Sequence, residues 1–273
     1  SPGPGSAALV GRMMTSTRDL MVTYAWRLIA SGVAVVLLAI GTAVGVGAMA
    51  QHETVATTKY SSAEVSALKV DAQQSNVTIT GSANPEVIIE RVARAGLTSA
   101  DGTVTFVGGT LVLSSGCPDL LPGLGCEVDF NIIVPSGLPV TVNHRAGEVV
   151  LAELSGPVSL DASQANISLS RLTGDVQLRA SQTNLQATGL RSPTAEIDIS
   201  FGSATFDFLT APTRVRASAS FSDLSLSVPT TPEGFDVSTD ANRLSEIEVS
   251  VPTNAESPHE VRLSGTASAI RLN

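Results

Sequence analysis

The sequence predicts a mainly β fold: a β-solenoid of the single-stranded β-helix type, with coils of 18–20 residues, preceded by one transmembrane α-helix. Three observations predict this class. Apolar residues recur every 18 to 20 positions from residue 138 onward, one uncharged apolar stretch precedes the β-rich part, and aromatic residues make up only 4% of the chain. Small inward side chains suit a thin stack of coils better than a globule with a bulky core.

The composition excludes some classes of protein. A chain of 273 residues is long enough for one or two domains with a sizeable core. Only 15% of the residues are charged, which argues against a disordered polyelectrolyte. The formal net charge is −9, whereas proteins that bind nucleic acid generally are usually basic. We therefore expect no nucleic-acid partner.

An apolar stretch near the N-terminus predicts the location. Residues 28–50 carry no charge, and as a helix they would span about 34 Å, enough for a hydrocarbon core of about 30 Å. Arg12, Arg18 and Arg27 precede the stretch, so the positive-inside rule places the N-terminus in the cytoplasm. We expect a cytoplasmic tail (1–27), a transmembrane signal anchor (28–50), a linker (51–62) and an extracytoplasmic domain (63–273).

A cleaved signal peptide is the alternative to an uncleaved anchor. Ala48, Met49 and Ala50 have the small-x-small form of a signal peptidase site. The apolar stretch is longer than the roughly 7–15 residues usual for a signal peptide, which favours the anchor. Two locations stay open: a single-pass protein of the cell membrane, or a secreted protein cleaved after Ala50.

The two cysteines fit an oxidising exterior. Cys117 and Cys126 bracket a short loop rich in proline and glycine. Their spacing is poor for zinc, and two residues supply only half of a structural site. We expect a disulfide between them, and two free thiols are the alternative.

The regular part of the chain, residues 138–273, consists of repeats. Each unit has two short runs of alternating apolar and polar residues, typical of half-buried strands. One unit is too small to bury its own apolar face, so neighbouring units must stack. An antiparallel β-sandwich is the alternative. The first inward residues are Val140, Val158, Val176, Ala195, Val215, Phe235 and Val261, although the second strand of the Phe235 unit arrives about three residues late.

Residues 80–135 do not keep the period. Gly108 and Gly109 separate two of the longer apolar runs and predict a hairpin turn. We expect this irregular part, with the predicted disulfide, to cover an open end or flank of the stack, because bare strand edges invite aggregation. Its expected strands are Val87–Val92, Val104–Val107, Leu111–Leu113 and Val128–Val134.

Two outward columns of the predicted stack alternate in charge. Equivalent residues of adjacent coils would lie about 4.8 Å apart, where opposite charges attract and like charges repel. Such exposed pairs contribute only about 0.2–1 kcal/mol each, so they help to set the register more than the stability. One predicted ladder consists of Asp161, Arg179 and Asp198, and the other of Glu196, Arg216 and Asp236.

Two further columns concern the corners and a candidate binding face. Asn76, Asn166 and Asn184 occupy equivalent corners, where asparagine tolerates the left-handed conformation. Phe201 and Phe221 share another corner position and are placed to stack. On the second strand of each unit, an outward column offers hydroxyl and amide groups to a glycan or a protein: Ser168, Gln186, Thr205 and Ser225.

The stretch Ile133–Val142, followed by short units of the form Gly-x-Val-x-Leu, resembles the bacterial "putative adhesin" family. Val-Pro steps recur at residues 228–229 and 251–252, as in that family, and the likeness covers roughly residues 60–273. The resemblance implies an extracytoplasmic β-solenoid behind one transmembrane helix, with no established catalytic residues. Most units here lack the family's corner glycine and have Asn, Ser or Asp instead, which leaves the exact coil shape open.

The sequence contains no motif for catalysis. It has three histidines, of which His144 falls at an inward position, and it lacks Gly-x-Ser-x-Gly, a P-loop and a His-x-x-x-His pair. We expect no enzyme, cofactor or metal site. Clustered carboxylates on a β-helix would instead suit a glycan-acting enzyme, with Asp161, Asp175, Asp198 and Asp207 as the candidates.

The sequence therefore predicts a membrane-anchored envelope scaffold or adhesin-like interaction module, with an envelope glycan or protein as its partner. The alternatives are a glycan-acting envelope enzyme and a self-assembling structural protein, because the last coil leaves an open edge. The oligomeric state stays open.

Overall fold

The computed structural model describes residues 52–61, 63–95, 101–116 and 127–273. Every regular element in these ranges is a strand, which confirms the mainly β class. The described part contains no helix with the length and apolarity that a membrane span requires. The predicted tail (1–27), the predicted anchor (28–50) and the predicted disulfide between Cys117 and Cys126 lie outside the described residues.

The strands belong to one 15-stranded sheet. Its elements are β1 (His52–Ser61), β2 (Ala67–Ser82), β3 (Glu86–Ala95), β4 (Asp101–Val107), β5 (Thr110–Gly116), β6 (Glu127–Pro135), β7 (Val140–Ala152), β8 (Val158–Ser170), β9 (Val176–Leu190), β10 (Thr194–Phe208), β11 (Arg214–Ser227), β12 (Asp236–Ala241), β13 (Glu246–Val249), β14 (Glu260–Thr266) and β15 (Ala269–Leu272).

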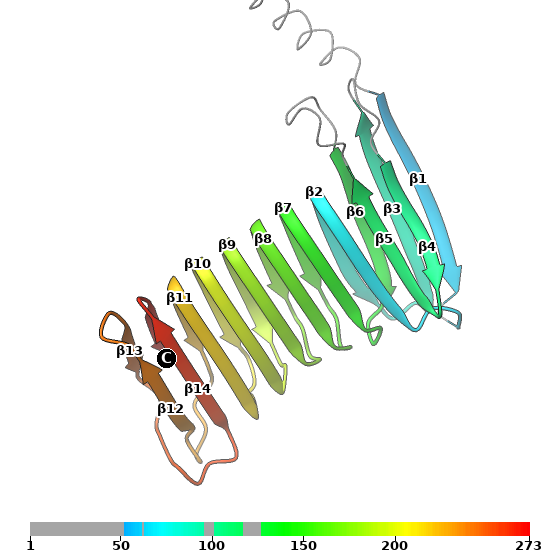
Figure 1. Cartoon of the computed structure of the whole chain (residues 1–273). Helices are drawn as coiled ribbons and strands as arrows, with labels where there is room; N and C mark the ends of the chain where they lie inside the picture. Colours follow the sequence, from blue (N-terminus) through cyan, green and yellow to red (C-terminus); the bar gives the residue numbers. More distant parts are fainter. Residues whose placement is uncertain (1–51, 62, 96–100, 117–126) are drawn as a thin grey trace, which may run out of the picture. The chain divides into compact units, whose positions relative to one another are not determined.

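Six long strands lie side by side in chain order: β2, then β7 to β11 (Figure 1). All five pairings are parallel, and from β7 onward the partners are 18 to 20 residues apart in sequence. Val140 pairs with Val158, and Val158 pairs with Val176, as the repeat predicts. The parallel register excludes the antiparallel sandwich for these strands.

Each long strand bends at an equivalent non-glycine residue with a positive φ. These residues are Gln74, Ala146, Gln164, Gln182, Phe201 and Phe221, with φ between 50° and 60°. The ladder skips this position in every pairing, for example between Ser200–Ser220 and Gly202–Ser222. A left-handed residue costs roughly 1–2 kcal/mol in an L-amino-acid chain, so stacking against both neighbours has to compensate for each bend.

The core lies along one face of the bent strands. Burial alternates with period two, as in β9, where Val176, Leu178 and Ala180 are buried between exposed residues. The inward column at the strand starts is valine on β7, β8, β9 and β11, with Leu68 on β2 and Ala195 on β10, so most of the stacked side chains are β-branched. Adjacent turns come very close: a Cβ on Gly174 would lie 2.1 Å from the carbonyl oxygen of Gly156.

The irregular part adds strands to the outer edge of β2. β5 pairs with the first half of β2 and β6 with the second half, both parallel. β4 and β5 form the predicted antiparallel hairpin, and Gly108 and Gly109 in its turn both have positive φ. Residues 52–61 correct the predicted linker: they form β1, which pairs along its whole length with β3.

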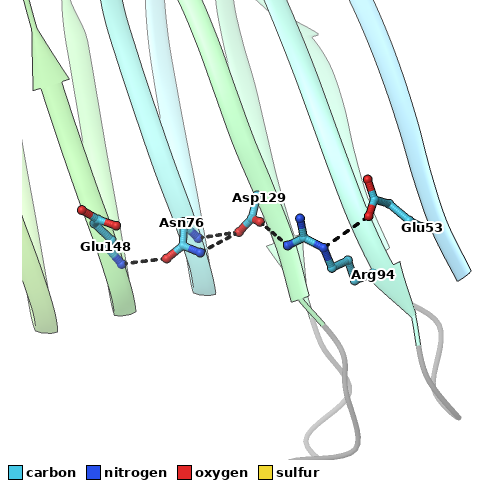
Figure 2. Close-up of polar contacts among 5 residues, drawn as sticks. All are labelled: Glu53, Asn76, Arg94, Asp129 and Glu148. Atoms are coloured by element: carbon cyan, nitrogen blue, oxygen red, sulfur yellow. Dashed lines mark hydrogen bonds and ion pairs between the residues drawn. The ribbon is translucent and has the colours of Figure 1, made fainter. Parts of the chain in front are cut away.

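A chain of polar contacts links five neighbouring strands at this junction (Figure 2). Arg94 on β3 contacts Glu53 on β1 at 3.6 Å and Asp129 on β6 at 2.7 Å. The Asp129 carboxylate also accepts hydrogen bonds from the backbone and side-chain nitrogens of Asn76 on β2. The side-chain amide oxygen (Oδ1) of Asn76 in turn accepts a hydrogen bond from the backbone N–H of Glu148 on β7. Antiparallel strands and parallel stack are therefore joined by side chains as well as by the backbone.

The C-terminal strands depart from the predicted order. β14 lies between β11 and β12, so β12 comes after β14 in the sheet. Val261 and Leu263 on β14 are fully buried and need a strand on both sides, whereas β12 is mostly exposed and suits an edge. Phe235 was expected to start this unit, but Val237 is the residue that pairs with Val261. Phe235 is instead buried in the connection and packs against His259.

Candidate interaction surface

The first predicted charge ladder lies in register. Arg179 on β9 is the direct partner of Asp161 on β8 and of Asp198 on β10. All three side chains are exposed. No ion pair joins them in the described structure, so their attraction acts across about one strand spacing, through solvent.

Only one of the two pairs in the second predicted ladder is present. Glu196 and Arg216 are direct partners, but the next strand places Arg262 beside Arg216. Asp236 pairs with Glu260 and lies two strands away from β11. The insertion of β14 is the cause, because it separates β12 from β11. Arg216 and Arg262 therefore lie side by side on neighbouring strands. The Glu260 carboxylate forms ion pairs with the guanidinium groups of Arg214 and Arg262.

A shallow groove of about 460 Å³ runs over the outward face at this place. It crosses β10, β11, β14 and β12. Charged groups of both signs and several hydroxyls line it, among them Asp198, Arg216, Asp240 and Arg262. The sequence could not reveal this groove, because its residues meet only through the changed strand order.

The predicted hydroxyl and amide face is present as one column. Ser168, Gln186, Thr205 and Ser225 are successive partners on β8, β9, β10 and β11. The first three side chains are exposed and Ser225 is half-buried. Near the start of this column, a hollow of about 250 Å³ is lined by Asn166, Asn184 and Ser203 as well. The face can donate and accept hydrogen bonds along a straight line of strands.

The corner column carries the most distinctive side chains. The Gln164 amide nitrogen donates to the Gln182 amide oxygen at 3.1 Å. On the next two strands the predicted stack of Phe201 on Phe221 is confirmed, with ring centroids 5.3 Å apart. Both rings are more than half exposed. Asn166 and Asn184 do not take the left-handed corner that was expected of them: glutamines two residues earlier do.

Three described groups have displaced pKa values. Burial lowers the pKa of His144, whose Nε2 contacts the Ser75 carbonyl oxygen at 2.8 Å. Partial burial alone would raise the pKa of Asp71, but hydrogen bonds from Asn143 and Lys69 lower it overall. The hydrogen bond from Arg214 lowers the pKa of Glu260. His144 is buried and the two carboxyls are held in their charged form, so none is prepared as a general acid.

No family model matches this chain, and no curated protein does. Several solved structures are similar to it. A cell adhesion protein of Clostridium sporogenes, described as putative, is 9% identical, with a TM-score of 0.37 over 81% of this chain and 99% of that one. A putative adhesin of Parabacteroides merdae is 12% identical (TM-score 0.44; 81% and 96% covered), and one of Bacteroides fragilis is 17% identical (TM-score 0.34; 81% and 97% covered).

Proposed function

We propose that this chain is a membrane-anchored protein whose part 63–273 is a β-solenoid that acts outside the cytoplasmic membrane as an adhesin-like scaffold or interaction module. One observation carries the proposal: β2 and β7 to β11 pair in parallel, in register, and bend at the same position. A chain that repeats one bent strand every 18–20 residues follows the path of a single-stranded β-helix.

The exposed columns support an interaction role. The polar column from Ser168 to Ser225 and the corner column from Gln164 to Phe221 run across the same four strands. Extended surfaces of this kind are the binding surfaces of stacked-repeat proteins. Two of the four candidate carboxylates of the enzyme alternative, Asp161 and Asp198, are separated by Arg179, so these two do not face each other across an open site.

The anchor is tested with the full chain. A fusion of alkaline phosphatase after Asn273 gains activity only where disulfides form, outside the cytoplasm. We expect an active fusion that sediments with the membranes. Activity that is released from the membranes would support cleavage after Ala50 instead, and an inactive but intact fusion would overturn the proposed topology.

The interaction role needs a separate experiment. Cells that display the full chain should bind isolated cell envelopes or host glycans more strongly than cells without it. Lysines in place of Gln186 and Thr205 would add charge and bulk to the polar column without touching the core, so we expect binding to fall. Binding that is equal with and without the chain would contradict an adhesin-like role.

Self-assembly is a second candidate, because β12 and β13 lie at an edge of the described sheet. Among the described strands, β12 pairs only with β14, and β13 only with β15. This edge carries Asp236, Asp240, Glu246 and Glu248, and carboxylates on an edge oppose pairing with an identical edge. Sedimentation of the full chain in detergent at high and low salt distinguishes the two: assembly that appears only when charge is screened would show that the carboxylates block it.

A further inference from the structure

The aromatic stack ends at a slot. Phe221 is the last aromatic of the corner column, because the next left-handed corner, between β14 and β15, is Ala267. In the turn before β13, Leu244 precedes Glu246, the partner of Ala269, by two residues and is 78% exposed. One free face of the Phe221 ring therefore borders an open space above a small side chain.

A second row of residues repeats this arrangement. Asp223 on β11 pairs with Ala269 on β15, and Ala269 pairs with Glu246 on β13. Two alanines form the floor, while Phe221 with Asp223 and Leu244 with Glu246 form the walls. The walls are two strand spacings apart, about 9–10 Å between backbones. The slot has a volume of about 680 Å³ and also takes in Arg243.

The turn that carries the second wall is held in place. The side-chain oxygen of Asn242 accepts hydrogen bonds from the backbone N–H of Leu244, the hydroxyl of Ser245 and the backbone N–H of Ala267. One side chain thus ties the wall to the floor. A wall fixed before binding loses less conformational entropy when a ligand arrives.

The chemistry of the slot combines an apolar ring face with charged groups at the rim. Asp223, Arg243 and Glu246 form no ion pair or side-chain hydrogen bond with other described residues, so they are available to a ligand. Carboxylates accept hydrogen bonds from hydroxyls, and the guanidinium donates them. A purely apolar partner would leave these three groups unsatisfied. A pyranose ring matches both the apolar and the charged part of the slot, because its flat C–H face can lie on the Phe221 ring while its hydroxyls bond to the charged groups at the rim.

We propose that this slot binds one pyranose ring of a glycan chain. The inference rests on the proposed function, because it names the class of partner that the extracytoplasmic domain would take. Ligand sites of this kind join an apolar surface to a few convergent polar groups. The corner column leads into the slot at Phe221, and the polar column crosses the same strands, β8 to β11, so both offer further contacts to the same glycan.

The test uses the full chain in detergent and two soluble probes, cellotetraose and chitotetraose, with titration calorimetry. We expect binding of at least one probe. Phe221→Gln should weaken it about tenfold or more, because glutamine occupies the same corner on β8 and β9 and keeps the fold. Asn242→Ala should weaken it less, through loss of the fixed wall. Phe106→Gln removes another half-exposed aromatic on β4 and should leave affinity unchanged.

Ala267→Phe provides the sharpest variant. It continues the stack by one ring and fills the slot, so binding should disappear while the melting temperature stays the same or rises. Unchanged binding in this variant would overturn the proposal, as would an absence of binding to both probes. Stronger binding of N-acetyltyrosinamide than of either glycan would show that the slot takes an aromatic side chain of a protein instead. These results are independent of the phosphatase fusion, so failure of the site and failure of the proposed topology are distinguishable.

Discussion

Phe201 and Phe221 stack with their ring planes only 3° from parallel, on two neighbouring strands and both in the left-handed conformation. The position of each ring is imposed by the bend of the chain, since every long strand has a left-handed residue there. The choice of phenylalanine is not imposed, because Gln164 and Gln182 occupy the same position on β8 and β9. The stack is therefore a local feature that the fold tolerates at an exposed corner.

A double-mutant cycle measures this stack. Phe201→Gln, Phe221→Gln and the double variant keep a side chain that the corner already accepts. We expect a coupling free energy of about 0.5–1.5 kcal/mol, the usual value for an aromatic pair beyond its buried area. Chemical unfolding of the full chain in detergent, followed by circular dichroism, gives the four values. Additive effects would show that the rings are neighbours without mutual stabilisation.

Reversal of charge in the first ladder should be more harmful than in the second. Arg179→Glu places a carboxylate between Asp161 and Asp198, and we expect a loss of about 1 kcal/mol from two like-charge pairs. Arg216→Glu is the matched control, because it would gain repulsion from Glu196 and attraction from Arg262. Unfolding at about 0.1 M and 1 M salt checks the cause, since screening should remove the difference. Equal losses in both variants would argue against the register.

The turn at Gly174 should not accept a side chain. A Cβ there would lie 2.1 Å from the Gly156 carbonyl oxygen and 2.7 Å from that of Ser155. Both contacts are with backbone atoms of the neighbouring turn, so the two turns would have to separate, and we expect Gly174→Ala to cost about 1–3 kcal/mol. Gly137→Ala is the control, because its nearest atom would be the Ser155 hydroxyl at 4.0 Å. Thermal melting should show a clear loss only for the first variant.

Acid should weaken the fold through His144. The Nε2 of this residue contacts the Ser75 carbonyl oxygen, and its Nδ1 is buried without a partner among the described residues. Burial lowers the pKa of His144 below 6.5 in the folded state, so the unfolded chain binds a proton more readily. The free energy of unfolding should therefore fall as the pH drops below about 6.5.

His144→Ala separates this effect from other titrations, because Ala162 and Ala180 occupy the equivalent positions on β8 and β9. The variant loses packing at every pH, but its stability should decline less than that of the parent chain between pH 7.5 and pH 5. Urea unfolding at both pH values gives the comparison. Identical declines would show that His144 does not titrate during unfolding in this range.

Sequence alone was enough to predict the repeat, its register over β7 to β11, the hairpin at Gly108 and Gly109, and the stacking position of Phe201 and Phe221. These features depend on local alternation and on a fixed spacing, both of which can be read along the chain. The same information placed Arg179 between Asp161 and Asp198, and it aligned the polar column from Ser168 to Ser225.

Three features emerge only from the folded chain: the order of the C-terminal strands, the pairing of β1, and the identity of the left-handed corner residues. Asp236 does not join its predicted ladder, because β14 lies between β11 and β12. This order buries the apolar side chains of Val261 and Leu263 between two strands and leaves the more polar β12 at the edge. β12 and β14 are distant in sequence, and either could pair with β11. Which of them takes this buried position depends on their relative apolarity, and no local sequence pattern predicts that. The slot beside Phe221 follows from that strand order, because its walls and floor come from β11, β15 and the turn before β13.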